Sequence, residues 1–256
     1  MEQNGAYLTT GLKNSMILFI IFISHWYLSL FVQTFFLHRY ASHQMFKMHP
    51  ITEKVFFILT WIAQGSSFLH PAAYALMHRK HHEHSDTDKD PHSPVSFNNW
   101  FKFMYKTRDE YASFIDKVND GDYEDKSLPR WPLIEKVGDS YISRIGFVLL
   151  YVSIYLIFAP TYWLLLLIPI HILMGPIHGF IVNWFGHKHG YRNFKKLHDN
   201  SKNTLFIDFL MMGELYQNNH HKFPTKTNFA FRWFEFDIGF IIIKILDKLR
   251  IVNILR

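Results

Sequence analysis

Histidine is the residue type whose spacing in this chain could do chemistry. The 256-residue sequence has 17 histidines, and two of its clusters, HRKHH and QNNHH, share one spacing. The residues at that spacing are His78, His81 and His82 in the first cluster and Gln217, His220 and His221 in the second. Positions i, i+3 and i+4 lie on one face of a helix, so each cluster could bind a metal ion with several side chains.

Two further motifs carry histidines near apolar segments. His38 and His43 form HRYASH, and His187 follows Asn183 by four residues. An i, i+5 pair lies about 140° apart on an ideal α-helix. His38 and His43 can therefore converge only if the helix ends or distorts between them.

The composition limits what these histidines can bind. The chain has no cysteine, so nitrogen or oxygen must hold any metal. HExxH and ExxH are both absent, which excludes a zinc protease and argues against a carboxylate-bridged di-iron bundle. Eight imidazoles are too many for one ion and suit two first-row metals, with iron as the redox candidate. The acidic residues expected to orient the imidazoles are Glu83, Asp86, Asp88, Asp90 and Glu214.

The other histidines lack a partner at ligand spacing, and we expect structural or solvated roles for them. They are His25, His49, His70, His84, His92, His171, His178, His189 and His198.

The elements that position the clusters include membrane segments. Residues 16–37 contain no charged residue over 22 positions, enough to span a hydrocarbon core of about 30 Å. Residues 145–185 are also uncharged and predict a two-helix hairpin that turns at 159–161. Residues 55–77 are uncharged but interrupted at 65–67 and at 70–71, so they could span, lie at the interface or form a re-entrant helix. An embedded or interfacial helix is favoured, because a full crossing would separate the clusters. Residues 229–249 predict an interfacial amphipathic helix.

The basic residues indicate which side carries the clusters. Residues 38–140 hold 13 Lys and Arg and residues 186–256 hold 12, so the positive-inside rule places both regions in the cytoplasm. Residues 97–140 predict short amphipathic helices and loops. We expect an all-α integral membrane protein, one domain over 1–256, with three to four transmembrane helices and a cytoplasmic helical cap that holds a histidine-rich di-iron site.

The motifs resemble the three histidine boxes of the membrane fatty acid desaturases, in particular the acyl-CoA delta-9 branch and its bacterial relatives. HRYASH, HRKHHEHSDTDKDPH and GELYQNNHHKFP are the boxes, and NWFGHKHGYRNF resembles a fourth family motif. The resemblance implies that Asn183 contacts an iron-bound water. It implies these iron ligands: His38, His43, His78, His81, His82, His187, His220 and His221.

The chain departs from the family pattern in two ways. Gln217 stands where the third box most often begins with histidine; its amide oxygen could bind iron directly or hold a water. The family usually has two transmembrane helices before the first box, whereas the sequence predicts one here.

The resemblance implies a cis double bond, at the delta-9 position, made in a saturated acyl chain with O2 and two electrons at two Fe²⁺ ions. The substrate would be an acyl-CoA or a membrane lipid, and a separate ferredoxin, rubredoxin or cytochrome b-type carrier would supply electrons. The expected location is a bacterial inner membrane, with the active site facing the cytoplasm. Residues that could bind an anionic head group are Arg79, Lys80, Lys188 and Arg192.

Two other functions fit parts of the pattern. A membrane di-iron hydroxylase or monooxygenase acting on an alkyl or sterol substrate would use a similar ligand set. A non-enzymatic membrane metal-binding or transport protein would need polar or ionisable residues along a path, and the apolar segments offer only scattered ones: His25, Gln33, His171 and His178. The basic excess has no stacking platform or basic run beside it, so no nucleic-acid partner is expected.

Overall fold

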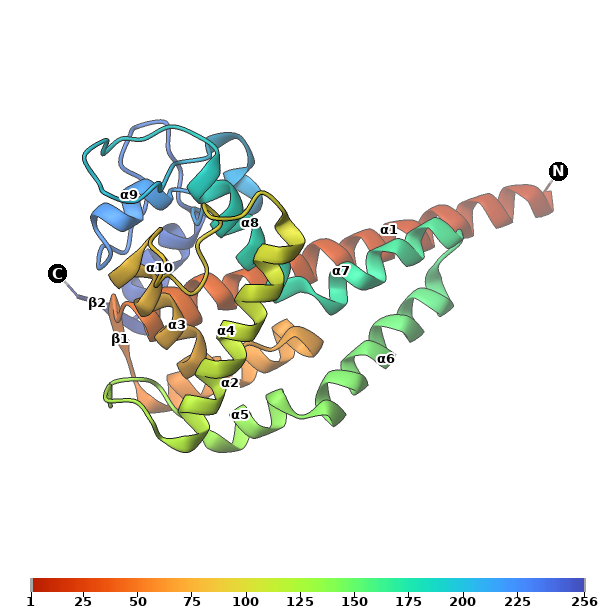
Figure 1. Ribbon diagram of the computed structural model, residues 1–256. Helices are drawn as coiled ribbons and strands as arrows, with labels where there is room; N and C mark the ends of the chain where they lie inside the picture. Colours follow the sequence, from red (N-terminus) through yellow and green to blue (C-terminus); the bar gives the residue numbers. More distant parts are fainter. Residues whose placement is uncertain (1, 256) are drawn as a thin grey trace.

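One long helical segment supports the whole structure. The computed structural model describes residues 2–255, with side chains from Thr10 onward. Helix α1 (Glu2–Val32) continues directly into the π-helix η1 (Gln33–Ser42), and residues 10–42 are long and apolar enough to cross a membrane. Figure 1 shows the N-terminal part of α1 extending away from α3, α4, α8 and α9, with the α6–α7 hairpin beside it.

The π-helix explains how the first two histidines meet. Hydrogen bonds in a π-helix join residues five apart, so residues at that spacing approach the same face. The backbone N–H of His43 donates to the carbonyl oxygen of His38, and the two ring centroids are 5.1 Å apart. The distortion that the i, i+5 spacing required is therefore present.

The predicted hairpin is confirmed, but its second arm is broken. Helix α6 (Tyr141–Phe158) is the first arm; the second consists of η3 (Tyr162–Leu167), α7 (Ile168–Ile172) and α8 (Met174–Lys188), bent by 74° before α8. A continuous helix would press the ring of Pro176 against the carbonyl of Ile172. At the break, Ser66 Oγ donates to the Ile172 carbonyl at 3.0 Å, and the Gly175 N–H donates to Ser67 Oγ at 3.0 Å.

The apolar segment over residues 55–77 is interrupted at the residues that break its sequence pattern. The chain forms α2 (Pro50–Gln64), a 3-10 turn (η2, Gly65–Ser67) and α3 (Pro71–His84). Gly65 adopts a φ of +52°, and a side chain there would overlap the Tyr151 hydroxyl. This turn reverses the chain and brings α3, with its histidines, back against η1.

The remaining elements form the cap. Helix α4 (Trp100–Asp120) is one long helix rather than the predicted short ones, and α5 (Pro132–Asp139), η4 (Leu205–Leu210), α9 (Gln217–Lys222) and α10 (Ile238–Lys248) follow. Strands β1 (Phe46–Met48) and β2 (Val252–Ile254) pair antiparallel, with Lys47 opposite Asn253. The helix predicted over 229–249 begins only at Ile238, because Asp237 accepts the Phe240 N–H as its N-cap.

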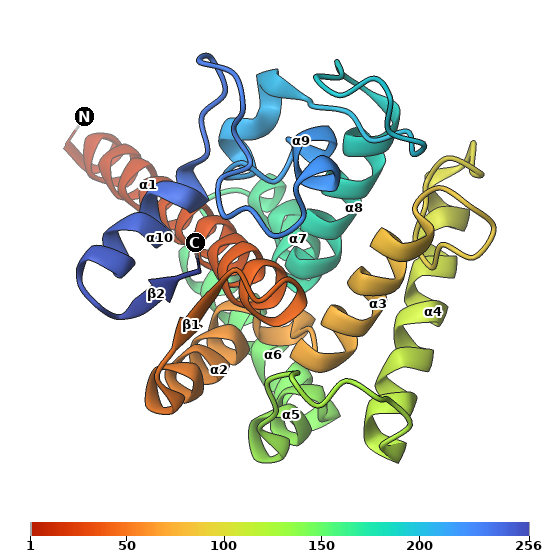
Figure 2. The same ribbon diagram turned by 90° about the vertical axis from the view of Figure 1, so that its left-hand side faces the viewer.

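The helices therefore separate a membrane part from a metal-bearing part. In the described chain, residues 10–42 and 141–158 can each span a membrane. If the bent pair formed by residues 162–172 and α8 counts as one span, the chain has three candidate spans. This agrees with the lower end of the predicted three to four. Figure 2 shows α3, α8 and α9 around the end of α1, at the opposite end of the molecule from the N-terminus.

Candidate metal centre

All eight predicted histidines meet at this end of α1, in two groups. We call the first, contributed by η1 and its end, α3 and α9, the five-histidine group: His38, His43, His78, His82 and His220. The second, from α3, α8 and α9, is the three-histidine group: His81, His187 and His221. Within each group the candidate ligand atoms lie within 4.8 Å of one another.

The ring nitrogens of the five-histidine group face one another at ligand spacing. The Nε2 atom of His220 is 3.0 Å from Nε2 of His38 and 3.0 Å from Nε2 of His82. The Nε2 atoms of His43 and His78 are 2.8 Å apart. Two nitrogens bound at right angles to an ion about 2.1 Å away lie about 3.0 Å apart. The donor set therefore fits a first-row metal ion.

Four carboxylates fix the orientation of four imidazoles. In each pair the Nδ1–H of the histidine donates to the carboxylate. The pairs are His38 with Glu214 at 2.6 Å, His81 with Asp90 at 2.8 Å, His187 with Asp86 at 2.9 Å and His221 with Asp199 at 2.9 Å. A carboxylate on Nδ1 leaves the Nε2 lone pair free to bind a metal.

Three of the five predicted acidic partners are confirmed in this position: Asp86, Asp90 and Glu214. Glu83 instead contacts Lys80 and His84 at the surface, and Asp88 is exposed. The sequence reasoning missed Asp199, which lies 22 residues before His221 and outside every motif. Only the loop between α8 and η4 brings it to the site.

The three-histidine group has unused ligand atoms. Among the described residues, the buried Nε2 atoms of His81, His187 and His221 have no hydrogen-bond partner. A buried polar atom without a partner costs about 1–3 kcal/mol. A metal ion would remove that cost for three atoms at once, so this group also fits a metal.

Burial keeps the imidazoles neutral, as metal ligation requires. Burial, and to a smaller extent the neighbouring histidines, lowers the pKa of five of these histidines well below the ordinary value: His43, His78, His81, His82 and His220. For Asp199, burial alone would raise the pKa, but the hydrogen bonds from His221 and Ser201 outweigh it and lower the pKa. The carboxylate is thus charged beside the imidazole that it orients.

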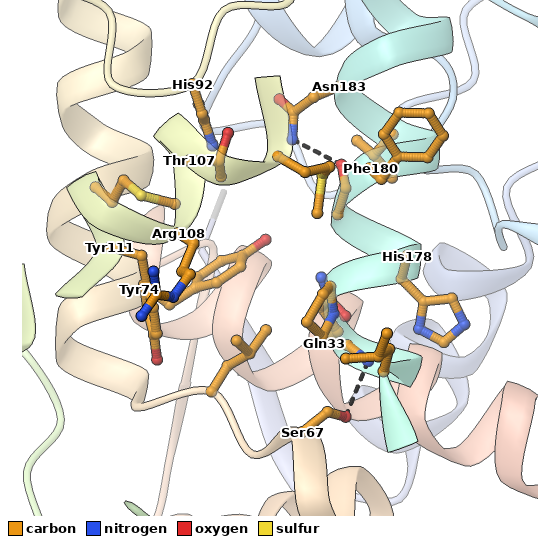
Figure 3. A pocket seen from close by; sticks show the side chains of 18 of the residues that line it. Gln33, Ser67, Tyr74, His92, Thr107, Arg108, Tyr111, His178, Phe180 and Asn183 are labelled. Carbon is orange, nitrogen blue, oxygen red and sulfur yellow. Dashed lines mark hydrogen bonds between the residues drawn. The ribbon is translucent and has the colours of Figure 1, made fainter. Parts of the chain in front are cut away.

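An apolar cavity of about 310 Å³ opens against the centre. It is enclosed by η1, α3, α4 and α8, and its wall includes His38, His78, Asn183 and Gln217. Asn183 lies in the upper part of Figure 3 beside His92, and its Nδ2 donates to the Gly179 carbonyl at 2.9 Å. Gln217 is buried, and its Nε2 donates to the Glu214 carbonyl at 2.6 Å.

Several of the other histidines have structural roles, but one lies at the centre. His49 and His70 accept backbone N–H groups as N-caps of α2 and α3. His25 and His171, which looked scattered in the sequence, contact each other through their Nδ1 atoms at 2.6 Å. His92 is buried, its ring centroid lies 4.5 Å from that of His81, and with Asp90 it forms a third candidate metal group. In the sequence, only the position of His92 in the DPH motif that ends the second box could have indicated its place at the centre.

The four basic residues that could bind an anionic head group instead contact other residues of the protein. Arg79 pairs with Asp125, Lys80 with Glu83, and Arg192 with Asp199; Lys188 donates to the Phe97 carbonyl. None of the four lines the cavity. The arginines that do are Arg108 and Arg144.

Comparisons with known proteins agree with this site. The family model for fatty acid desaturases matches residues 14–237. Similar proteins include a hex-5-enoyl-[acyl-carrier protein] acetylenase from Moorena producens (29% identical; 91% of this chain, 74% of the relative), and an acyl-CoA C20 Delta5-desaturase from Anemone leveillei (28%; 86% and 67%). Delta-9 acyl-lipid desaturase 1 of Arabidopsis thaliana is 26% identical over 82% of this chain and 66% of that protein. The chain, a membrane protein with a histidine-rich centre, thus belongs to the fatty acid desaturase family, whose members are oxidoreductases that act on fatty acids.

Proposed function

We propose that this chain is a membrane fatty acyl desaturase that introduces a cis double bond, at the delta-9 position, into a saturated acyl chain carried by CoA or by a lipid. The observation that carries the proposal is the continuity between the apolar cavity and the metal centre. The cavity wall includes His38 and His78 of the five-histidine group together with Asn183. A methylene pair in this cavity would lie beside the ligands.

The proposed cofactor is a pair of Fe²⁺ ions, with the eight histidines as ligands and O2 as co-substrate. When bound, the irons would supply the two-electron reduction of O2 needed to oxidise an unactivated CH2–CH2 unit. Two hydrogens leave the substrate, two electrons come from a donor, and with two protons from solvent both oxygen atoms leave as water. The chain has no cysteine for an iron–sulfur cluster, so we propose a separate ferredoxin, rubredoxin or cytochrome b-type donor.

The chain's own residues have three tasks in this proposal. The apolar wall, including Leu30, Met77 and Phe103, holds the acyl chain and excludes water. The four carboxylates hold the imidazoles in the tautomer that binds metal. Asn183, whose Nδ2 is already used by Gly179, keeps its Oδ1 free to accept a hydrogen bond from a water at the metal end of the cavity. Gln217 binds iron through its Oε1 or holds a water there.

The orientation follows from charge. Both regions that carry ligands are rich in Lys and Arg, whereas Lys13 is the only Lys or Arg before the first ligand. We therefore propose a bacterial inner-membrane protein, one domain over 1–256, with the metal centre facing the cytoplasm.

The test is double-bond mapping by gas chromatography and mass spectrometry in a desaturase-deficient host. Cells would express the wild type, His221→Ala or, as a matched control, His198→Ala, which changes an exposed histidine outside both groups. We expect a new delta-9 monounsaturated acid from the wild type and the control, and none from His221→Ala.

Other products would change the proposal. A double bond at another position would refute the delta-9 assignment and leave desaturation in place. A hydroxylated acid that depends on His221 would replace desaturation by hydroxylation. Product formation by His221→Ala at the wild-type level would show that the metal site is wrongly placed.

A further inference from the structure

The cavity wall carries hydrogen-bonding groups that the protein does not use. Gln33 and His178 both line the cavity and are 5% and 0% exposed. Among the described residues, Gln33 Oε1 and both ring nitrogens of His178 have no hydrogen-bond partner. In Figure 3, Gln33 lies toward Ser67, at the end of the cavity away from Asn183 and His92, and His178 borders the same region.

Neighbouring polar groups on the same wall are satisfied within the protein. Ser66 Oγ donates to the Ile172 carbonyl, Ser67 Oγ accepts the Gly175 N–H, and Asn183 Nδ2 donates to the Gly179 carbonyl. Two other atoms of the wall, Nε2 of His92 and Oγ1 of Thr107, are also unpaired within the described chain, but Figure 3 places them at the opposite end of the cavity from Gln33 and Ser67. Because η1 and α8, which carry Gln33 and His178, lie in the candidate membrane spans, bulk water does not reach their unpaired atoms to form hydrogen bonds.

Gln33 and His178 are positioned to contact a bound acyl chain rather than the metal ions. Gln33 precedes the ligand His38 by five residues, and His178 precedes the ligand His187 by nine, about 13 Å along α8. Both groups therefore lie alongside the part of the cavity that extends beyond the reacting carbons. A plain hydrocarbon chain there would leave these polar atoms without hydrogen bonds, which costs binding free energy. A substrate oxygen that forms the hydrogen bonds would remove this cost.

We propose that the preferred substrate is an acyl chain with a hydroxyl substituent that hydrogen-bonds to Gln33 and His178. This inference rests on the proposed function, because it names the substrate class of the same cavity. A hydroxyl would donate to Gln33 Oε1 and accept from the N–H of the neutral His178 ring. The remaining wall is apolar and accommodates the rest of the chain.

The test compares ligands that differ by one hydroxyl group. The purified full chain in detergent would be titrated with stearate, 10-hydroxystearate and 12-hydroxystearate, each displacing a fluorescent fatty acid. We expect at least one hydroxy acid to bind about tenfold or more tightly than stearate. Gln33→Leu and His178→Phe should each remove most of that preference without weakening stearate binding. Thr60→Val is the matched control, because the Thr60 hydroxyl pairs with the Phe56 carbonyl outside the cavity and the preference should persist.

Binding needs neither O2 nor an electron donor. The binding test can therefore fail or succeed independently of the desaturation assay. Equal affinities in the wild type, or a preference that survives in the Gln33→Leu, His178→Phe double variant, would overturn the inference and show that water satisfies these groups. Binding of none of the three acids would also overturn the inference, because no preference for a hydroxyl group would be detected. A hydroxy-acid preference without any desaturated product would leave the inference standing and refute the proposed function.

Discussion

Glu214 holds the imidazole of His38 from 176 residues away, with its Oε2 2.6 Å from Nδ1 of His38. Its other oxygen accepts a hydrogen bond from Thr34, and Arg39 lies 3.8 Å from it. Burial by itself would raise the pKa of Glu214, but the hydrogen bonds from His38 and Thr34 and the charge of Arg39 lower it. An ionised carboxylate therefore joins the third motif to the first.

Glu214→Gln should weaken Fe²⁺ binding about ten- to hundredfold, because the side chain keeps its shape but loses the charge that orients His38. Retained iron would be measured by mass spectrometry across a series of chelator concentrations. Glu83→Gln is the matched control, since Glu83 contacts only Lys80 and His84 at the surface. Identical chelator curves for both variants would refute a role for Glu214 in ligand orientation.

Gly186→Ala should reduce both iron retention and thermal stability. Alanine normally stabilises a helix interior by about 1 kcal/mol relative to glycine. At position 186, however, the added Cβ would collide with Cγ of Gln217, at the start of the helix that carries His220 and His221. Gly146→Ala is the control, because no atom lies near its added Cβ. If the two variants behave alike by calorimetry and iron analysis, the close approach of α8 and α9 is not required.

Removal of the metal should lower the unfolding temperature by about 10 °C, since an ion that binds only the folded state at 100 times its Kd adds about 2.7 kcal/mol. The measurement is differential scanning fluorimetry before and after chelation and after Fe²⁺ is restored. His198→Ala should show the full effect and His78→Ala little of it. A chelator effect of equal size in His78→Ala would contradict the assignment of His78 as a ligand.

Asp208→Asn should stabilise the protein at neutral pH. Burial, together with the carboxylates of Asp237 and Glu214, raises the pKa of Asp208 to about 8, against about 3.9 in the unfolded chain. Between these values the folded state holds a proton that the unfolded state releases, so stability falls as pH rises toward 8. The variant removes this dependence and should unfold several degrees higher at pH 7. Parallel melting curves from pH 5 to 8 for both proteins would contradict the prediction.

The sequence by itself identified the eight histidines that the structure brings together and the segments that carry them. The i, i+3, i+4 spacing of His78, His81 and His82 required one helical face, and α3 provides it. The uncharged runs determined where α1 and the α6–α8 hairpin lie, because a spanning segment must exclude charge over its full length. The family resemblance follows from the same motifs and is confirmed by the match over residues 14–237.

The tertiary structure decided what depends on contacts between distant residues. Pairing of Asp199 with His221 and packing of His92 against His81 have no periodic signature. The break before α8 depends on Pro176, but Ser66 and Ser67, about 110 residues away, supply the hydrogen bonds that stabilise it. The cavity likewise exists only where η1, α3, α4 and α8 meet. Local spacing determines which side chains share a face, whereas long-range packing determines which faces meet and which polar groups remain unpaired.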